Sequence, residues 1–374
     1  MIIGVLQEPS PETRVSLLPE HMATLIKWNT QVLVETGAGA NAFANDDKYV
    51  SAGASIESRA GILSKATIVL SINPLTDADI IECKGKVLFG LFQPLFQPQL
   101  IKDLAAKGFT VFSIDMLPRT TRAQSMDVLS SQANIAGYKA VLQAANSFPK
   151  YFPMFMTAAG SIPPAKMLIL GAGVAGLQAI ATGKRLGAVV EVFDTRPAVK
   201  EEVMSLGAKF IEVEGAADAT KAGGYAVEQT EEFMQRQKAK IAESVAKADI
   251  VISTAQIPGK KAPILITDEM MQAMKNGSVI IDLAAATGGN TSQTKNEATV
   301  QYNGVLIIGN SNLAAGMPSD ASKLYGKNIL NFLQLIITKD GELNLNFEDD
   351  LVKGTCVANA GEVTNELINS LLSQ

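Results

Sequence analysis

The sequence predicts an α/β protein with two Rossmann-like lobes, each built on a parallel sheet, joined by two crossover helices around a central cleft. Short apolar runs alternate with helical segments along the chain, which is the pattern of parallel sheets flanked by helices. Glycines stand just before expected strands, as in Leu186-Gly-Ala188, where a left-handed glycine would end a helix. The 374 residues exceed what one core usually serves, at roughly 150 residues per domain. Two lobes are therefore expected.

The expected strands form two groups. In the first lobe they are Ile2–Leu6, Gln31–Glu35, Ile68–Ile72, Val87–Leu91 and Thr110–Ser113. In the second they are Met167–Leu170, Val189–Phe193, Phe210–Val213, Ile250–Ser253, Val279–Asp282 and Val305–Gly309. Met126–Ser147 and Ser319–Thr338 have helical spacing and are the expected crossover helices. This assigns residues 1–127 and 320–374 to the first lobe and residues 128–319 to the second.

Composition excludes several classes of protein. Hydrophobic residues make up 47% and charged residues 18%, which favours large buried cores over disorder. A net charge of −5 without a Lys/Arg run argues against nucleic acid as a partner. Cys83 and Cys356 lie far apart without metal-ligand spacing, so we expect buried, inert thiols and no metal site. The first residues show no basic n-region, so we expect no export signal, and Ile329–Ile337 falls short of the ~20 apolar residues of a membrane span.

A glycine-rich turn carries the strongest functional signal. The expected strand ending at Leu170 runs directly into Gly171-Ala-Gly173-Val-Ala-Gly176, which opens a helix. In this context the first glycine permits the tight turn, the second lets the backbone approach a pyrophosphate, and the third packs helix on strand. Gly171, Gly173, Val174 and Gly176 are therefore expected to bind a dinucleotide.

The acidic residue after the next strand indicates which dinucleotide. Asp194 follows Gly176 by 18 residues, where a carboxylate would bond the adenosine ribose 2′-hydroxyl. A 2′-phosphate there would be repelled, which favours NAD(H) over NADP(H). Arg196, next to Thr195, could instead pair with a phosphate, although an ion pair with Glu201–Glu202 is the simpler explanation.

The sequence contains few candidate residues for acid–base catalysis. The single histidine, His21, stands at the start of an expected helix without a carboxylate or cysteine signature, and we expect it to face solvent. Dehydrogenases acting on hydroxy or amino acids move a proton and usually employ a His or Lys for it. Hydride transfer between two nicotinamides needs close approach, about 3 to 3.5 Å, and no such acid or base. The sequence fits transfer between cofactors.

Several motifs together resemble the NAD(H)-binding component of proton-translocating transhydrogenases, from the N-terminus to about Val357. The most specific is Pro118-Arg-Thr-Thr-Arg-Ala-Gln-Ser-Met-Asp127 with Asn134-Ile-Ala-Gly-Tyr138, similar to the loop that this family carries between its lobes. Further motifs are Thr157-Ala-Ala-Gly160, Pro163-Pro-Ala-Lys166, Ile257-Pro-Gly259, Ile281-Asp-Leu-Ala284 and Gly288-Gly-Asn290.

The resemblance implies site residues. Arg119, Gln124, Asp127 and Ser130 would surround the nicotinamide, with Arg119, Gln124 and Asp127 as the catalytic set. Arg119 and Asp127 could form a charge-assisted pair, and Gln124 would bridge toward the partner's nucleotide. Without the resemblance, the same segment would be a helix cap and surface ion pair. Further cofactor contacts would be Gly224 and Tyr225, in a small-residue-rich segment that matches the family's mobile lid or is a plain surface loop, and Ala255 and Gln256.

The resemblance also implies partners and leaves alternatives. The protein would be a homodimer, on the cytoplasmic face of the inner membrane, bound to the NADP(H)-binding and membrane domains of a transhydrogenase. One alternative is a stand-alone alanine-type dehydrogenase, whose pocket uses an Arg, a Lys and a His. Arg14 could match the arginine, but Ser71 replaces the lysine, also common in transhydrogenases, and Phe92 or Gln93 occupies the histidine region. The other is an NADH-sensing module without catalysis.

Overall fold

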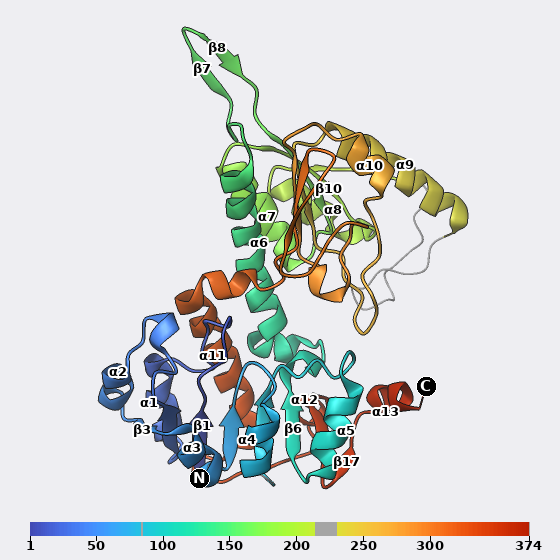
Figure 1. The fold of residues 1–374 in the computed structure, drawn as a ribbon. Helices are drawn as coiled ribbons and strands as arrows, with labels where there is room; N and C mark the ends of the chain where they lie inside the picture. Colours follow the sequence, from blue (N-terminus) through green and yellow to red (C-terminus); the bar gives the residue numbers. More distant parts are fainter. Residues whose placement is uncertain (84, 214–229, 374) are drawn as a thin grey trace. The chain divides into compact units, whose positions relative to one another are not determined.

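The computed structural model describes residues 1–83, 85–213 and 230–373 (Figure 1). The chain forms two compact units, one of Met1–Gln132 with Ala315–Gln374 and the other of Ala133–Ala314. Both contain a large, mostly parallel sheet, which confirms the predicted α/β class.

The sheet of the first unit has the order β17-β16-β6-β5-β4-β1-β2-β3. The strands β1 to β6 run parallel, whereas β16 and β17 are antiparallel additions from the C-terminal part of the chain. The bounds are β1 Ile2–Val5, β2 Gln31–Glu35, β3 Ser55–Glu57, β4 Ile68–Leu70, β5 Val87–Gly90, β6 Thr110–Ser113, β16 Cys356–Asn359 and β17 Glu362–Val363. Of these strands, β3, β16 and β17 were not predicted from the sequence.

The helices of this unit cover both faces of its sheet. They are α1 Pro19–Lys27, α2 Asp46–Ser51, α3 Arg59–Lys65, α4 Asp77–Glu82, α5 Pro98–Ala106, α11 Pro318–Ile336, α12 Asp350–Thr355 and α13 Glu366–Leu372. Successive residues of β5 enter different cores, with Phe89 on one side and Leu88 on the other. Phe332 of α11 lies 5.2 Å from Phe89 and 5.7 Å from Phe112 between ring centroids. The late helix α11 is thus part of the first unit's core.

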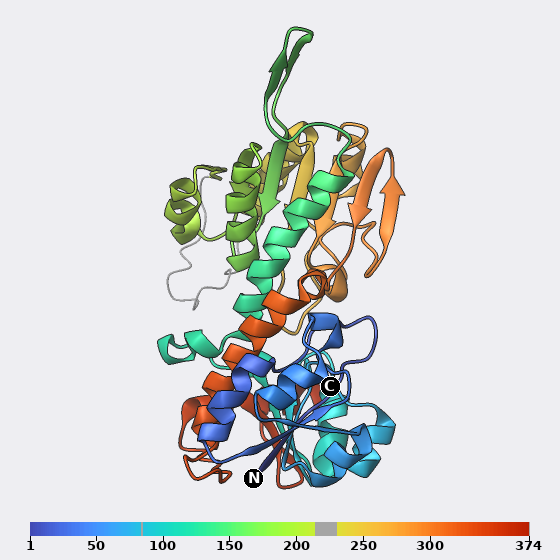
Figure 2. The ribbon, with the colours of Figure 1, turned by 90° about the vertical axis from the view of Figure 1, so that its left-hand side faces the viewer.

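The sheet of the second unit has the order β11-β10-β9-β12-β13-β15-β14, antiparallel only at β14. Its strands are β9 Lys166–Leu170, β10 Val189–Phe193, β11 Lys209–Phe210, β12 Ile250–Ser253, β13 Val279–Asp282, β14 Thr299–Tyr302 and β15 Val305–Ile308. Its helices are α6 Val128–Ser147, which begins in the first unit, α7 Val174–Arg185, α8 Lys200–Ser205, α9 Glu231–Lys247 and α10 Asp268–Gln272. Figure 2 shows α6 across one face of this sheet, and Val141 and Ala144 of this helix belong to the same buried cluster as Ile169 of β9.

A hairpin that the sequence analysis did not predict projects from the second unit (Figure 1). It consists of β7 Phe155–Thr157 and β8 Gly160–Ile162. Its apolar side chains are exposed, Met156 at 73% and Phe155 at 42%. Tyr151 stacks on Phe155 with ring centroids 4.9 Å apart. The hairpin therefore presents an apolar surface that this unit does not cover.

The expected exposure of His21 is wrong. The side chain is buried on α1, where Nδ1 accepts a hydrogen bond of 2.9 Å from the Leu18 amide. A Cβ on Gly326 of α11 would lie 2.3 Å from the imidazole, so the ring packs directly on that helix backbone. Burial lowers the pKa of His21 to about 4, with Glu20 opposing the shift and Lys327 and Lys323 adding to it. The ring is therefore neutral near pH 7.

The two cysteines match their prediction. Cys83 and Cys356 are buried free thiols, and burial raises the pKa of Cys83 to about 11 and that of Cys356 to about 12. None of the helices in the described part of the chain combines the length and apolar character that crossing a bilayer requires.

Candidate dinucleotide site

The strand order of the second unit marks where a ligand would bind. From β9 the chain moves to β10 and β11 on one side, then returns to β12 on the other. In open parallel sheets, ligands bind outside the carboxyl ends of the two strands at which the order reverses. Here those strands are β9 and β12, and the glycine-rich turn follows β9 directly.

Each glycine of the turn has a distinct steric role. Gly171 has φ +103°, and a Cβ there would lie 2.4 Å from Oγ1 of Thr254. A Cβ on Gly176 would lie 1.9 Å from the carbonyl oxygen of Gly171, so only glycine lets α7 begin this close to β9. Around Gly173 a Cβ would meet no atom within 4 Å. Gly173 therefore borders open space, as a backbone approached by a ligand would.

The start of α7 fits a diphosphate. Gly173 is the N-cap, with no side chain capping the first turn, and that turn carries no acidic residue. Its free amide groups and the positive end of the helix dipole favour an anion. Val174, the first helical residue, is 39% exposed beside them. The residues present thus fit the pyrophosphate of a dinucleotide.

The turn itself orients Asp194, which follows β10. Its Oδ2 accepts a 2.7 Å hydrogen bond from the Ala172 amide. Arg196 donates from Nε to Oδ1 at 2.9 Å and from Nη2 to Oδ2 at 2.8 Å. The hydrogen bond with Asp194 is the main reason that the pKa of Arg196 is raised. The acid is thereby fixed beside the turn, with half-buried Thr195 next to it.

The expected pairing of Arg196 with Glu201–Glu202 needs correction, because its main partner is Asp194. The chain bends at Thr195, and the Arg196 amide also donates to Oδ1 of Asp194 at 2.8 Å, which brings the two side chains together. The guanidinium fork matches the carboxylate geometry. The charge of the acid is thus compensated within the protein.

The segment after β12 lies against the glycine turn. Thr254 donates from its amide to the Leu170 carbonyl at 2.9 Å and from Oγ1 to the Gly171 carbonyl at 3.1 Å. Ala255 follows, half-buried, and exposed Gln256 donates from Nε2 to the Leu283 carbonyl at 2.9 Å. The ends of β9, β10 and β12 thus bring together three of the predicted segments.

Two buried side chains that the sequence analysis left without a role hold this segment. Asn290 accepts from the Ala255 amide through Oδ1 at 3.2 Å and donates from Nδ2 to the Ala255 carbonyl at 2.8 Å. Asp282 accepts from the Asn290 amide at 2.6 Å and from Oγ1 of Thr294 at 2.6 Å. Both side chains are completely buried. Both residues stand in motifs that resemble the family, Ile281-Asp-Leu-Ala284 and Gly288-Gly-Asn290. The contact between Asn290 and Ala255 spans 35 residues, however, and only the fold reveals it.

The loop predicted to act at the nicotinamide belongs to the first unit. Arg119 and Gln124 are exposed, Gln124 within the 3₁₀ segment η3, Thr121–Met126. Asp127 stands immediately before α6 and accepts from the Ser130 amide at 2.9 Å and from Ser130 Oγ at 2.6 Å. The structure therefore brings Asp127 and Ser130 together as a helix N-cap. Gly224 and Tyr225 lie outside the described residues.

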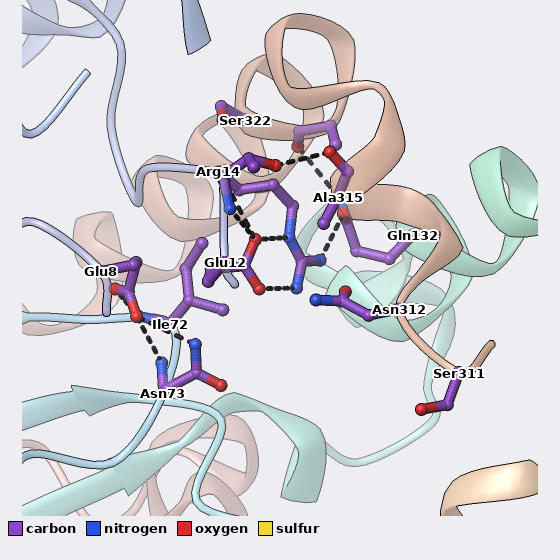
Figure 3. A network of polar contacts seen from close by, with 12 residues as sticks. Glu8, Glu12, Arg14, Ile72, Asn73, Gln132, Ser311, Asn312, Ala315 and Ser322 are labelled. Carbon is purple, nitrogen blue, oxygen red and sulfur yellow. Dashed lines mark hydrogen bonds and ion pairs between the residues drawn. The ribbon is translucent and has the colours of Figure 1, made fainter. Parts of the chain in front are cut away.

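In the first unit the first five strands have the same order, but a side chain of the protein occupies the corresponding reversal point. Its order reverses between β1 and β4, where the segment after β1 carries Glu8 instead of glycines. Glu8 accepts from the amides of Ile72 at 2.5 Å and Asn73 at 3.1 Å (Figure 3). Burial raises the pKa of this carboxyl, with the amide hydrogen bonds opposing the shift. Of the two reversal points in the described sheets, the one in the second unit therefore offers open helix amides to a phosphate.

A neighbouring buried ion pair engages Arg14, the residue that could match a substrate-binding arginine. Arg14 donates from Nε and Nη2 to the two carboxylate oxygens of Glu12, at 2.8 and 2.7 Å (Figure 3). Its Nη1 donates to Oε1 of Gln132 at 2.8 Å. Three donor groups of Arg14 are therefore already used within the first unit.

The fold and the turn define a protein of two Rossmann-like units, one of which carries a dinucleotide-type phosphate turn. The chain belongs to the alanine dehydrogenase/PNT family, because the N-terminal domain of that family matches residues 4–136 and its C-terminal domain matches residues 140–366.

Relatives of this chain include transhydrogenase proteins and alanine dehydrogenases. An NAD(P) transhydrogenase subunit alpha protein of Rhodospirillum rubrum is 45% identical, over 98% of both chains. A transhydrogenase structure from Sinorhizobium meliloti is 42% identical, with a TM-score of 0.89 over 97% of this chain and 100% of that chain. Alanine dehydrogenase of Bacillus subtilis is 29% identical, over 85% of this chain and 81% of its own. The transhydrogenase proteins are thus clearly the more similar of these.

Proposed function

We propose that the protein is the NAD(H)-binding subunit of a proton-translocating transhydrogenase. The observation that carries the proposal is the uncapped start of α7, open at Gly173, beside an acid held by the turn itself. The likeness to subunits named NAD(P) transhydrogenase supports the assignment. Bound NADH would supply a hydride for NADP+ held by a partner domain.

The chain's own residues would hold and orient the nucleotide. The amides at the start of α7 bind the diphosphate, and Asp194 accepts from the adenosine ribose. Arg119, Gln124 and Asp127 are proposed to act at the nicotinamide end, with Ser130, Ala255 and Gln256 as further contacts. Because Asp194 is already paired with Arg196, a 2′-phosphate would have to break that pair or meet the carboxylate, which supports NAD(H) over NADP(H).

The histidine supports transfer between cofactors over amino-acid oxidation. His21 is the sequence's single histidine, and it is buried against Gly326 with a pKa of about 4. Such a ring is poorly suited to exchange a proton with a substrate near pH 7. Arg14 is committed to Glu12, and Ser71 is buried in the place of a lysine. These features do not favour an alanine-type pocket.

Assembly would follow from the same proposal. A two-stranded hairpin is marginally stable alone in water, and the β7–β8 hairpin exposes Phe155 and Met156. A second copy of the chain covering this apolar arm is the proposed basis of a homodimer. The dimer would bind the NADP(H)-binding and membrane domains at the cytoplasmic face, and coupling to proton translocation would lie in those partners.

The decisive experiment mixes the purified chain with NADH and an NADP+ analogue, with and without a transhydrogenase NADP(H)-binding domain. A parallel reaction contains alanine and NAD+. We expect hydride transfer only with the partner domain. Turnover of alanine without a partner would establish the dehydrogenase instead, and tight NADH binding without turnover under any condition would indicate a sensing module.

A further inference from the structure

We propose that Asn328 and Asn331 of α11 are positioning residues for the segment that carries Arg119 and Gln124. This inference rests on the proposed function, because it concerns how that segment is presented to the reacting nucleotides. Neither asparagine belongs to the motifs that the sequence analysis singled out.

The two side chains converge on one backbone atom. Nδ2 of Asn328 and Nδ2 of Asn331 each donate to the Ser125 carbonyl oxygen at 2.8 Å. Residues three apart on a helix share a face, so a single helix delivers both donors. A carbonyl oxygen has two lone pairs, and both are used here. Ser125 directly follows Gln124, so the restraint acts one peptide from the residue expected to reach the partner's nucleotide.

The same segment is held at other points. Ala123 and Met126 are buried in the core at 2% and 7% exposure, whereas Gln124 between them is exposed. Arg122 donates from Nη1 and Nη2 to the carboxylate of Asp349, both at 2.6 Å, and also contacts Asp350. Gln124 is thus displayed from a backbone anchored on both sides.

Asn328 indicates that the hydrogen bond, and not packing, is what the asparagine contributes. The residue is 8% exposed, and within the described structure its Oδ1 has no hydrogen-bond partner. A buried unpaired amide oxygen costs free energy that an apolar side chain of similar size would avoid. What the amide supplies and an apolar residue lacks is the donor to Ser125.

The functional consequence concerns geometry more than nucleotide affinity. Hydride transfer depends on close, oriented approach, and a misplacement of 1 Å can cost ~100-fold in rate. The glycine turn and Asp194 would hold NADH in the second unit whether or not the Ser125 carbonyl is restrained. Loosening this restraint should therefore slow transfer while leaving NADH binding nearly intact.

The test uses the full chain with an NADP(H)-binding domain, and compares Asn331→Ala, Asn331→Asp and the double variant Asn328→Ala/Asn331→Ala. Asn331→Asp is nearly isosteric but lacks the amide donor, so it separates the hydrogen bond from packing. Asn369→Ala is the matched control. Asn369 lies on α13, and its Nδ2 also donates to a backbone carbonyl, that of Val363, at 3.1 Å. NADH affinity and hydride-transfer rate are measured separately.

We expect both single variants to slow transfer about three- to tenfold and the double variant about 10- to 100-fold, with NADH affinity within threefold of wild type. Hydrogen exchange of the amides near Ser125 should accelerate, and Asn369→Ala should behave as wild type. Asn331→Asp at the wild-type rate would overturn the inference even if the double variant fails to fold. Absence of transfer by the wild type would instead overturn the proposed function, and the inference with it.

Discussion

Replacing Gly173 with serine should separate folding from nucleotide binding. The position is the N-cap of α7, with φ −77° and ψ −169°, a conformation that serine readily adopts, and a Cβ would meet no atom within 4 Å. Serine is a slightly better N-cap than glycine, by a few tenths of a kcal/mol. The melting temperature should therefore change by less than about 2 °C.

The same side chain should obstruct the nucleotide. Its Cβ and hydroxyl would fill the space in which the backbone meets the pyrophosphate, and the hydroxyl would take an amide of the first turn. Losing one charge-assisted hydrogen bond costs about 1.5–3 kcal/mol. Because 1.4 kcal/mol corresponds to a factor of ten, NADH affinity should fall roughly 10- to 100-fold.

Calorimetric titration with NADH and thermal unfolding followed by circular dichroism would measure the two effects. Gly173→Ala is the matched variant, since it keeps the steric block but cannot cap the helix. It should lose affinity and about 1 kcal/mol of stability. An NADH dissociation constant within twofold of wild type for both variants would refute the proposed approach of the diphosphate to Gly173.

Three further substitutions test the scaffold. Gly176→Ala should lower the free energy of unfolding by about 1–3 kcal/mol, because its Cβ would lie 1.9 Å from a backbone oxygen of Gly171, and an unchanged urea midpoint would contradict this. Asn290→Ala should lower the free energy of unfolding by about 1–3 kcal/mol, because it leaves the backbone amide and carbonyl of Ala255 unpaired. It should also weaken NADH binding in calorimetry, and wild-type stability together with wild-type affinity would count against the role of Asn290. His21 has a pKa of about 4 when folded and 6.5 ordinarily, so the unfolded chain binds the extra proton. Its stabilising contribution is complete above pH 6.5 and is lost toward pH 4, by up to roughly 3 kcal/mol. In urea titrations across this range, His21→Asn should therefore show a weaker pH dependence than wild type, and parallel profiles would exclude the mechanism.

The sequence determined the features that depend on local pattern. Apolar runs of strand length identified most of the parallel strands, because strands buried on both faces need continuous apolar residues. Gly171, Gly173 and Gly176 were recognisable because backbone conformation and close approach demand glycine at fixed spacing. The missed strands are β3, β7, β8, β14, β16, β17 and, in part, β11; each has at most four residues, too few for a clear apolar pattern. Among them, β16 pairs with a strand distant in the chain, β6.

Only the tertiary structure decided which side chains are restrained by which partners. From the sequence, His21 was predicted to be an exposed residue of a helix. In the structure, Gly326 of α11, far along the chain, packs against its ring. Asn290 reaches Ala255 across 35 residues, and Asn328 reaches Ser125 across 203. The residues of a local motif can be recognised in the sequence. A hydrogen bond between distant segments depends on how helices pack on a sheet, and local sequence preferences do not determine that packing.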